Sequence, residues 1–359
     1  MNAEDIIPLR LQNQHLTNPN FTSPEEVVAH FGAVQCQDFA AAKWSVGLRM
    51  RQATDEIVER AFNEGKILRT HVMRPTWHFV MPEDIRWMLE LTAPRVKRIL
   101  APYDRKLDID TQFLARCRKL IGQALEDRKH LARAELGQYL GSHGIEASGQ
   151  RLGHIMSYME LDALVCSGPR RGKQMTYALL EERVPKVKTI TREQALAKLA
   201  LKYFTSHGPA QLKDFTWWSG LSSRDAAEGV ELAKPELGSD IVEGKIYYFK
   251  PLSKAPRRKT PLALLMSIYD EYTIAYKDRT ALSEGREKDV ETMLSMGNAL
   301  TAVIIINGKV AGTWKRTLTK NGIAVHLSPF RTLNSVEAEA LTAEIDRYGK
   351  FLNTPAAMV

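Results

Sequence analysis

The sequence repeats one order of elements three times: several short amphipathic helices, then two short strands joined by a polar turn. In the first passage, Thr54 stands where a helix begins and Gly65 where it ends, and residues 66–81 alternate like a two-stranded ribbon. The second passage closes with a hairpin at residues 163–180, and the third with one at residues 240–251. Helices followed by a ribbon are the order of a winged helix, so we expect three winged helices in tandem.

The last quarter of the chain has a different pattern. After a basic linker at residues 250–260, apolar runs and the Asn307-Gly308 turn predict a meander of strands, and a final helix is expected from a cap at Ser335. The predicted fold class is therefore α+β, with a small β-barrel or a curled sheet after the winged helices. The predicted domains are residues 1–81, 82–185, 186–256 and 257–359.

Length and composition limit the classes of protein to which the chain can belong. At 359 residues it is too long for one ordinary core and is expected to hold several modules. No apolar run reaches the roughly 18 residues that span a bilayer, and the acidic residues near the N-terminus are unlike a signal peptide. We therefore expect a cytoplasmic protein that does not contact a membrane, and we expect a monomer.

Cations gather where the pattern predicts turns or a linker, in a chain of net charge +8. They are Arg170, Arg171 and Lys173 in the second hairpin, Lys254, Arg257, Arg258 and Lys259 in the linker, and Lys315, Arg316 and Lys320 beside the last strand turn. Cations at turn tips can reach a groove of double-stranded DNA and neutralise its phosphates. Alternatively, they only keep exposed hairpins soluble and unpaired.

Two glutamines flank a cysteine in the stretch VQCQDFAAAKWSVGLR. Asp38 is placed to cap the helix that follows, so residues 34–37 are expected to be extended. In an extended segment, residues i and i+2 point the same way, which turns Gln35 and Gln37 toward one space and Cys36 into the core. In a helix, the two amides would lie about 200° apart and could not share a substrate.

A pair of amides suits only undemanding chemistry. An amide offers a carbonyl acceptor and an NH2 donor, so it can orient a water molecule but is no useful base. This suffices where the leaving group departs readily, as from a purine alkylated at N7 or N3, whose base is cationic. The sugar then becomes oxocarbenium-like, and an enzyme need only place water and stabilise that charge. The alternative is that these glutamines simply bond to backbone groups near the helix start.

The remaining chemistry-bearing residues suggest no metal and no cofactor. The cysteines (Cys36, Cys117 and Cys166) have no metal-ligand spacing, and motifs for nucleotide cofactors are absent from the sequence. Asp270 and Glu271, in the stretch YDEY, are an acidic pair framed by aromatic residues. They could act as an acid/base pair, or they could bond to a nearby arginine or to backbone N–H groups.

The first ribbon contains four further candidates for the lining of a pocket. These are His71, Arg74, Thr76 and His78. The alternative for the two histidines is that they only bond to their neighbours in the ribbon. Trp44, on the helix after the two glutamines, is expected in the core.

Five stretches, taken in order, resemble a known family: VQCQDFAAAKWSVGLR, RTHVMRPTWHFV, ELDALVCSGPRRGK, YFTSHGPAQLKDFTWWSGL and YDEYTIAYKDR. Together they are similar to the bacterial AlkZ-like winged-helix proteins, which are DNA glycosylases that unhook interstrand crosslinks and excise alkylated purines. The resemblance runs from about Leu9 to Trp314. It implies three tandem winged helices and a small β-barrel in a C shape around double-stranded DNA.

The resemblance also implies roles for particular residues. The catalytic signature of the family is Gln, any residue, then Gln or an acid, and Gln35 and Gln37 match its two-glutamine form. They would position and polarise the water that attacks the anomeric carbon, while residues 315–320 would match a DNA-contacting hairpin. Arg74-Pro75-Thr76 departs from the commoner Arg-Gly-Thr of the family, and a proline there would alter the edge of the pocket.

Two hypotheses for the function remain at this point. The first is a monofunctional DNA glycosylase that repairs alkylation damage or interstrand crosslinks without a cofactor or metal. The second is a non-catalytic winged-helix DNA-binding protein or transcriptional regulator, which would recognise a specific sequence and release no base.

Overall fold

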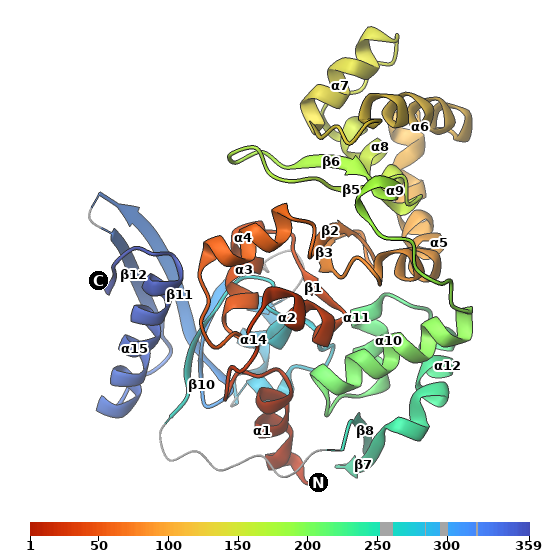
Figure 1. Cartoon of the computed structure of the whole chain (residues 1–359). Coiled ribbons are helices and arrows are strands. Elements are labelled where there is room, and N and C mark those ends of the chain that lie inside the picture. Colours follow the sequence, from red (N-terminus) through yellow and green to blue (C-terminus); the bar gives the residue numbers. More distant parts are fainter. Residues whose placement is uncertain (252–260, 284, 295–300, 321) are drawn as a thin grey trace.

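The computed structural model describes residues 1–251, 261–283, 285–294, 301–320 and 322–359, and its fold is mixed α+β as predicted (Figure 1). Helices alternate with small sheets along the first 250 residues, and a larger sheet with one long helix follows. The cluster formed by Lys254, Arg257, Arg258 and Lys259 lies outside the described residues.

The first part of the chain packs four helices around a three-stranded sheet of order β1-β3-β2. Its elements are α1 (Ala3–Asn13), α2 (Pro24–Phe31), β1 (Ala33–Gln35), α3 (Phe39–Gly47), α4 (Asp55–Asn63), β2 (Leu68–His71) and β3 (Trp77–Val80). The predicted caps Asp38 and Thr54 are confirmed, because each side chain accepts a hydrogen bond from a backbone N–H of the first helical turn. β1 pairs antiparallel with β3, which places Gln35 opposite His78.

The second part has a core of its own. Its elements are α5 (Ile85–Asp104), α6 (Thr111–Leu125), β4 (Leu131–Ala132), α7 (Arg133–Ser142), α8 (Gly149–Leu161), β5 (Val165–Ser167), β6 (Thr176–Leu179) and α9 (Leu180–Arg183), with a sheet of order β4-β6-β5. Buried side chains such as Ile121, Leu136 and Ile155 fill the space between α6, α7 and α8. Helices α6 and α7 therefore project from the rest of the molecule, at the top of Figure 1, whereas α5 joins the core shared with other parts of the chain.

The third part packs three helices against a two-stranded hairpin. Its elements are α10 (Arg192–His207), α11 (Leu212–Ser219), α12 (Ser223–Ala233), β7 (Gly238–Val242) and β8 (Lys245–Phe249). The hairpin turns at Glu243-Gly244 as predicted, and both residues have positive φ. Tyr203 and Trp218 belong to a core that also contains residues of β2, β3 and α5.

The last part is a five-stranded sheet of order β13-β12-β11-β10-β9. Its elements are β9 (Ala263–Met266), α13 (Glu271–Ile274), α14 (Glu287–Leu294), β10 (Ala302–Ile306), β11 (Lys309–Thr319), β12 (Gly322–Pro329), α15 (Ser335–Phe351) and β13 (Ala356–Met358). Within the described residues, β9 and β13 are edge strands, so of the two predicted forms, a small β-barrel or a curled sheet, the structure has the curled and open sheet. The long helix α15 contacts both edge strands and occupies the side on which they would otherwise meet.

Two local predictions in this part have different outcomes. The Asn307-Gly308 turn is confirmed, since both residues have positive φ and join β10 to β11 as a two-residue hairpin. A Cβ atom on Gly308 would come within 2.3 Å of the Ile7 side chain, so close packing of α1 also requires a glycine there. The cap of α15 is Asn334, one residue before the predicted Ser335, because Asn334 and Glu337 form a reciprocal capping box.

One core joins the first part of the chain to the last. Trp44 on α3 donates a hydrogen bond from Nε1 to the carbonyl oxygen of Leu265 on β9, at 2.7 Å, and packs against Tyr348 and Phe351 of α15. The prediction that Trp44 lies in the core is confirmed. Helix α3 is thus held between the small sheet and the large sheet, and its N-terminus lies where the two parts of the chain meet.

Candidate functional site

Gln35 is the last residue of β1 and is held by three neighbouring groups. Its backbone N–H donates to Oε1 of Glu271 at 2.7 Å, and its side-chain Oε1 accepts a hydrogen bond from Nη2 of Arg74 at 2.9 Å. Across the sheet it faces His78. Only 3% of Gln35 is exposed, so the amide is fixed in position before any substrate arrives.

Gln37 differs from Gln35 in being exposed. The ladder with β3 continues one residue past β1, because the N–H of Cys36 donates to the carbonyl oxygen of Trp77 at 2.7 Å. The side-chain Oε1 of Gln37 then accepts a long hydrogen bond of 3.4 Å from the N–H of Trp77. Both glutamine side chains therefore bond to residues 74–77, the end of the loop between β2 and β3 together with the first residue of β3. Cys36 lies in the core, and burial raises the pKa of its thiol to about 12.

Arg74 is a buried cation with few partners. Its exposed fraction is 8%, burial lowers its pKa, and Nε has no hydrogen-bond partner among the described residues. No described carboxylate forms an ion pair with it. His78 beside it is fully buried, and burial together with the Arg74 charge holds the pKa of His78 well below its usual value. The ring nitrogen Nδ1 of His78 lies 3.0 Å from the carbonyl oxygen of Thr76, so Nδ1 carries the hydrogen in the neutral ring.

The other two pocket candidates, Thr76 and His71, lie in different surroundings. The hydroxyl oxygen of Thr76 is buried and has no partner within the described residues. His71 points toward the second part of the chain, where its Nδ1 lies 2.5 Å from Oε2 of Glu160 on α8 and its ring packs on Trp77. The structure thus brings Arg74 and His78 together with Gln35, while His71 joins a contact between β2 and α8.

Glu271 is the residue at this site whose contact with Gln35 the sequence did not reveal. Its Oε1 accepts from the Gln35 backbone, and its Oε2 accepts from Nε1 of Trp218 at 2.9 Å and lies 3.3 Å from Nε2 of His207. The neighbouring Asp270 bonds to Arg49. Both carboxylates are fully buried and used by these contacts, which fits the bonding alternative for the acidic pair.

The cations of the second hairpin are largely engaged by acidic groups. Arg170 contacts Glu59 of α4 at 2.9 Å, and its side chain is only 14% exposed. Arg171 pairs with Glu135 of α7. Lys173 is exposed and has no ion-pair partner within the described residues. Of these three candidates, Lys173 is the one whose charge is most available to DNA.

The β11–β12 hairpin projects beyond the rest of the large sheet (Figure 1). Lys315 and Lys320 are exposed, and Arg316 bonds to the hydroxyl of Tyr348 on α15. Leu318, near the tip, is 72% exposed. The hairpin therefore offers two available cations and an apolar side chain at one edge of the molecule.

Comparison with known proteins identifies the family. A family model described as "DNA glycosylase AlkZ-like" matches residues 28–351, nearly the whole chain. The chain belongs to the AlkZ-like DNA glycosylase family. The predicted resemblance is confirmed, and with it the prediction of a DNA glycosylase at the level of the family.

Two relatives of this AlkZ-like chain come from Streptomyces sahachiroi. A protein named "Interstrand DNA cross-link repair glycosylase" is 22% identical over 335 residues, which cover 86% of each chain. The solved structure titled "Streptomyces sahachiroi DNA glycosylase AlkZ" matches with a TM-score of 0.82 and 20% identity, covering 100% of both chains. At this identity, the structural match concerns the fold alone.

Two further findings concern the classes of interaction considered for the AlkZ-like chain. In the part of the chain that the structure describes, no helix is both long and apolar enough to cross a membrane. Across the same residues, no group of three or more His, Cys, Asp or Glu side chains is arranged to hold a metal ion.

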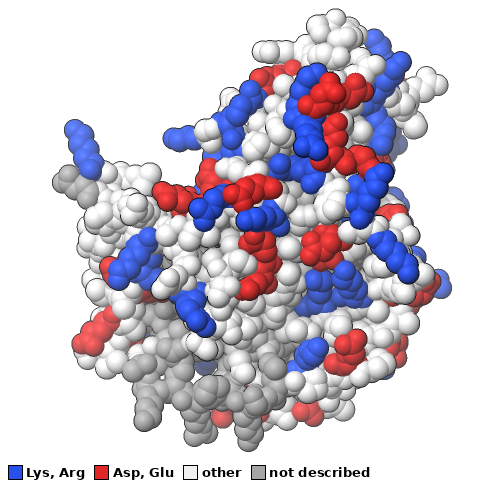
Figure 2. All heavy atoms as spheres, viewed as in Figure 1, with Lys and Arg blue, Asp and Glu red and all other residues white. Residues whose placement is uncertain are grey.

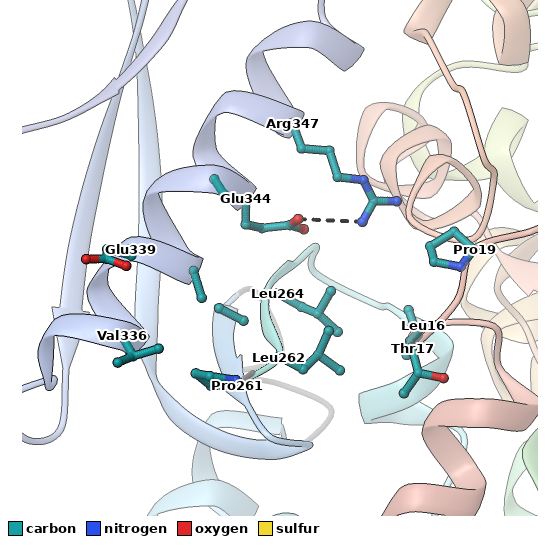
Figure 3. A pocket seen from close by; sticks show the side chains of 13 residues that line it. Leu16, Thr17, Pro19, Pro261, Leu262, Leu264, Val336, Glu339, Glu344 and Arg347 are labelled. Carbon is teal, nitrogen blue, oxygen red and sulfur yellow. Dashed lines mark ion pairs between the residues drawn. The ribbon is translucent and has the colours of Figure 1, made fainter. Parts of the chain in front are cut away.

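A cavity of about 450 Å³ lies between α15 and the start of β9, away from the two glutamines (Figure 3). Its walls include Leu262, Leu264 and Val336, and Glu344 and Arg347 meet at one side, 3.5 Å apart. Oε1 of Glu344 is buried without a partner within the described residues. Burial raises the pKa of Glu344 to about 7 in spite of Arg347.

The raised pKa of Glu344 predicts a pH-dependent stability of the AlkZ-like chain. Because the folded state holds this proton up to about pH 7 and an unfolded glutamate releases it near pH 4.5, stability should fall as pH rises between these values. At roughly 1.4 kcal/mol per pKa unit, the loss is about 3 kcal/mol. Glu344→Gln is expected to remove this loss in urea unfolding at pH 5 and pH 8.

Glu339→Gln is the matched control, since Glu339 lines the same cavity but is exposed. It should keep the pH dependence of the wild type. Equal pH dependence in the wild type and in Glu344→Gln would contradict the assignment to Glu344.

Proposed function

We propose that the chain is a monofunctional DNA glycosylase that hydrolyses the N-glycosidic bond of alkylated purines, with crosslinked purines as further substrates. The observation that carries the proposal is the geometry of the two glutamines, which directly precede α3. The side-chain oxygens of both accept hydrogen bonds from residues 74–77. A cationic alkylated base leaves without a general acid, so uncharged amides are sufficient to orient the attacking water.

The two amides differ in what they can do. Oε1 of Gln35 already accepts from the Arg74 guanidinium, so its carbonyl dipole is turned toward a cation and is not available to a positive sugar. Gln37 is exposed and its one side-chain bond, at 3.4 Å, is weak. We therefore assign the water-orienting role mainly to Gln37, and to Gln35 the role of holding the segment of residues 74–77.

The proposed partner is double-stranded DNA. The β11–β12 hairpin and the unit of α6, α7 and α8 stand on either side of α4, and the molecule is hollowed between them, with both cationic and acidic side chains around the hollow (Figures 1 and 2). Lys173, Lys315 and Lys320 are the candidate contacts to phosphate, because their charges are exposed. Arg170, Arg171 and Arg316, which have partners in the protein, would have to exchange them to bind DNA.

Several finer statements belong to the same proposal. We propose that the helices and ribbons within residues 1–81, 82–185 and 186–256 are winged helices, and that residues 257–359 form a separate module after them. The order of helices and strands supports this division. A monomer that clasps DNA in a C shape, in the cytoplasm, completes the proposal.

The experiment that tests the function is direct detection of a freed base. Duplex DNA methylated at purine N7 and N3 is incubated with excess protein, and released bases are identified by mass spectrometry. Release of 7-methylguanine or 3-methyladenine is the expected result. Intact DNA, together with a footprint at a specific sequence, would favour the non-catalytic regulator instead.

The hairpin cations predict a salt-dependent affinity for DNA. Each phosphate contact that is lost reduces the slope of log K against log[salt] by about 0.9. Lys315→Ala combined with Lys320→Ala is therefore expected to weaken binding to any duplex. It should also reduce the magnitude of this slope by roughly 1.8, the value for two lost phosphate contacts, as measured by fluorescence anisotropy. Lys350→Ala is the control, because Lys350 is exposed on α15 and pairs with Asp346. An unchanged slope in the double variant would exclude the hairpin as a phosphate contact.

A further inference from the structure

A second cavity of about 230 Å³ opens beside the N-terminus of α3 and is separate from the one in Figure 3. Its walls come from the first turns of α3, the residues after β9, the middle of β11 and Tyr348 of α15. Asp38 lines this cavity and directly follows Gln37 in the chain. Gln37 itself does not line the cavity, but its backbone adjoins that of Asp38 at the mouth, since consecutive Cα atoms are about 3.8 Å apart.

The walls of this cavity are aromatic and fixed. Trp44, Trp314 and Tyr348 all line it. Nε1 of Trp44 donates to the carbonyl oxygen of Leu265, and Nε1 of Trp314 donates to that of Met266 at 2.9 Å. Both indole rings also pack edge-to-face on Tyr348, so the three rings keep their orientation without a ligand and form one rigid aromatic wall.

Polar groups of the cavity are available to a ligand. Oγ of Ser267 is buried, with the residue only 6% exposed, and it has no partner among the described residues. Asp38 caps α3 through Oδ1 and is exposed at the mouth, where its charge favours a cationic ring. Lys315 lines the rim from β11 and offers positive charge to a phosphate.

We propose that this cavity receives the alkylated purine base of the damaged nucleotide after it leaves the base stack. The base would lie against the aromatic wall, its positive charge would be favoured by Asp38, and the adjoining phosphate would contact Lys315. The sugar would then lie next to Gln37. The inference rests on the proposed glycosylase function and adds the site that recognises the substrate, because base extrusion costs energy that stacking and polar contacts must return.

The test fills the cavity from its exposed side. Ala40 lines the cavity and is exposed on α3, so Ala40→Phe should plug it without disturbing the core. Since stacking on aromatic side chains contributes about 10- to 100-fold per base, base release under single-turnover conditions should fall by about that factor. Affinity for undamaged duplex DNA should not change. Ala115→Phe, at an exposed position on α6, is the matched control and should behave as the wild type.

A second readout does not depend on catalysis. Free 7-methylguanosine, whose base stays cationic because N9 is still bonded to the sugar, should quench the fluorescence of Trp44 and Trp314 in the wild type more strongly than guanosine does. Ala40→Phe should abolish the quenching, and Asp38→Asn, which can still cap α3, should remove the preference for the cationic base. If the wild type releases bases and Ala40→Phe releases them equally fast, the cavity proposal is overturned while the function stands.

If the wild type releases no base, the proposed function fails, and the fluorescence experiment decides the cavity separately. Quenching by 7-methylguanosine that is lost in Ala40→Phe supports the site. Equal quenching in both proteins, or none in either, overturns it.

Discussion

Gln37→Ala is expected to lower the rate of base release by a factor on the order of 100, the lower range for removing one hydrogen-bonding group that stabilises a transition state. The exposed amide of Gln37 has one weak bond within the protein, so it can reorient toward a water molecule. Single-turnover release of 7-methylguanine from methylated duplex DNA measures the effect. Affinity for DNA and the melting temperature should stay at wild-type values.

Gln112→Ala is the matched control for this prediction, because Gln112 is an exposed glutamine on α6, in another part of the chain. It should release bases at the wild-type rate. If Gln37→Ala also keeps that rate, Gln37 cannot be the residue that orients water.

Gln35→Ala should differ from Gln37→Ala in its effect on stability. Removing this amide leaves the buried Arg74 guanidinium without the side-chain oxygen that it contacts at 2.9 Å. An unsatisfied buried donor costs about 1 to 3 kcal/mol, more when it is charged. We therefore expect Gln35→Ala to lower both the free energy of unfolding and the rate of base release, whereas Gln37→Ala lowers the rate alone.

Local features of the fold could be predicted from the sequence because they depend on residues close together in the chain. Asp38 caps α3 through a backbone N–H three residues away, and the Asn307-Gly308 turn follows from the ability of both residues to adopt positive φ. The open edge of the large sheet could not be predicted in this way. It depends on whether β9 and β13 meet, and α15, which follows most of the sheet in sequence, occupies that side.

The candidate site shows the same limit. The spacing of Gln35 and Gln37 suggested one shared direction, and both side chains do bond to residues 74–77. The carboxylate that holds the Gln35 backbone belongs to Glu271, which is 236 residues away in the sequence. No local pattern connects the two. Likewise, a cation at a turn says nothing of the acid beside it, and Arg170 is engaged by Glu59 of a different part of the chain.

Asp270→Ala is expected to have the largest effect on stability, about 3 to 5 kcal/mol, as when one member of a buried ion pair is removed. Asp270 contacts both terminal nitrogens of Arg49, at 2.8 and 2.9 Å, and these two side chains are 0% and 1% exposed. Without Asp270, the Arg49 charge would stay buried without the carboxylate that now neutralises it. Urea unfolding measures the loss, and Asp346→Ala, which removes the exposed partner of Lys350, should change stability by less than about 1 kcal/mol.

The same pair should make the protein sensitive to acid. Burial alone raises the pKa of Asp270, but Arg49, Ser45 and the N–H of Tyr272 together lower it below its usual value. A carboxyl with a lowered folded pKa contributes stability above its unfolded pKa of 3.8, and loses it as pH falls through the folded value. Wild-type stability should therefore fall steeply in acid, while Asp270→Ala, already lacking this contribution, should show a shallower fall. Parallel acid profiles of the two proteins would mean that the Asp270 carboxyl contributes no pH-dependent stability.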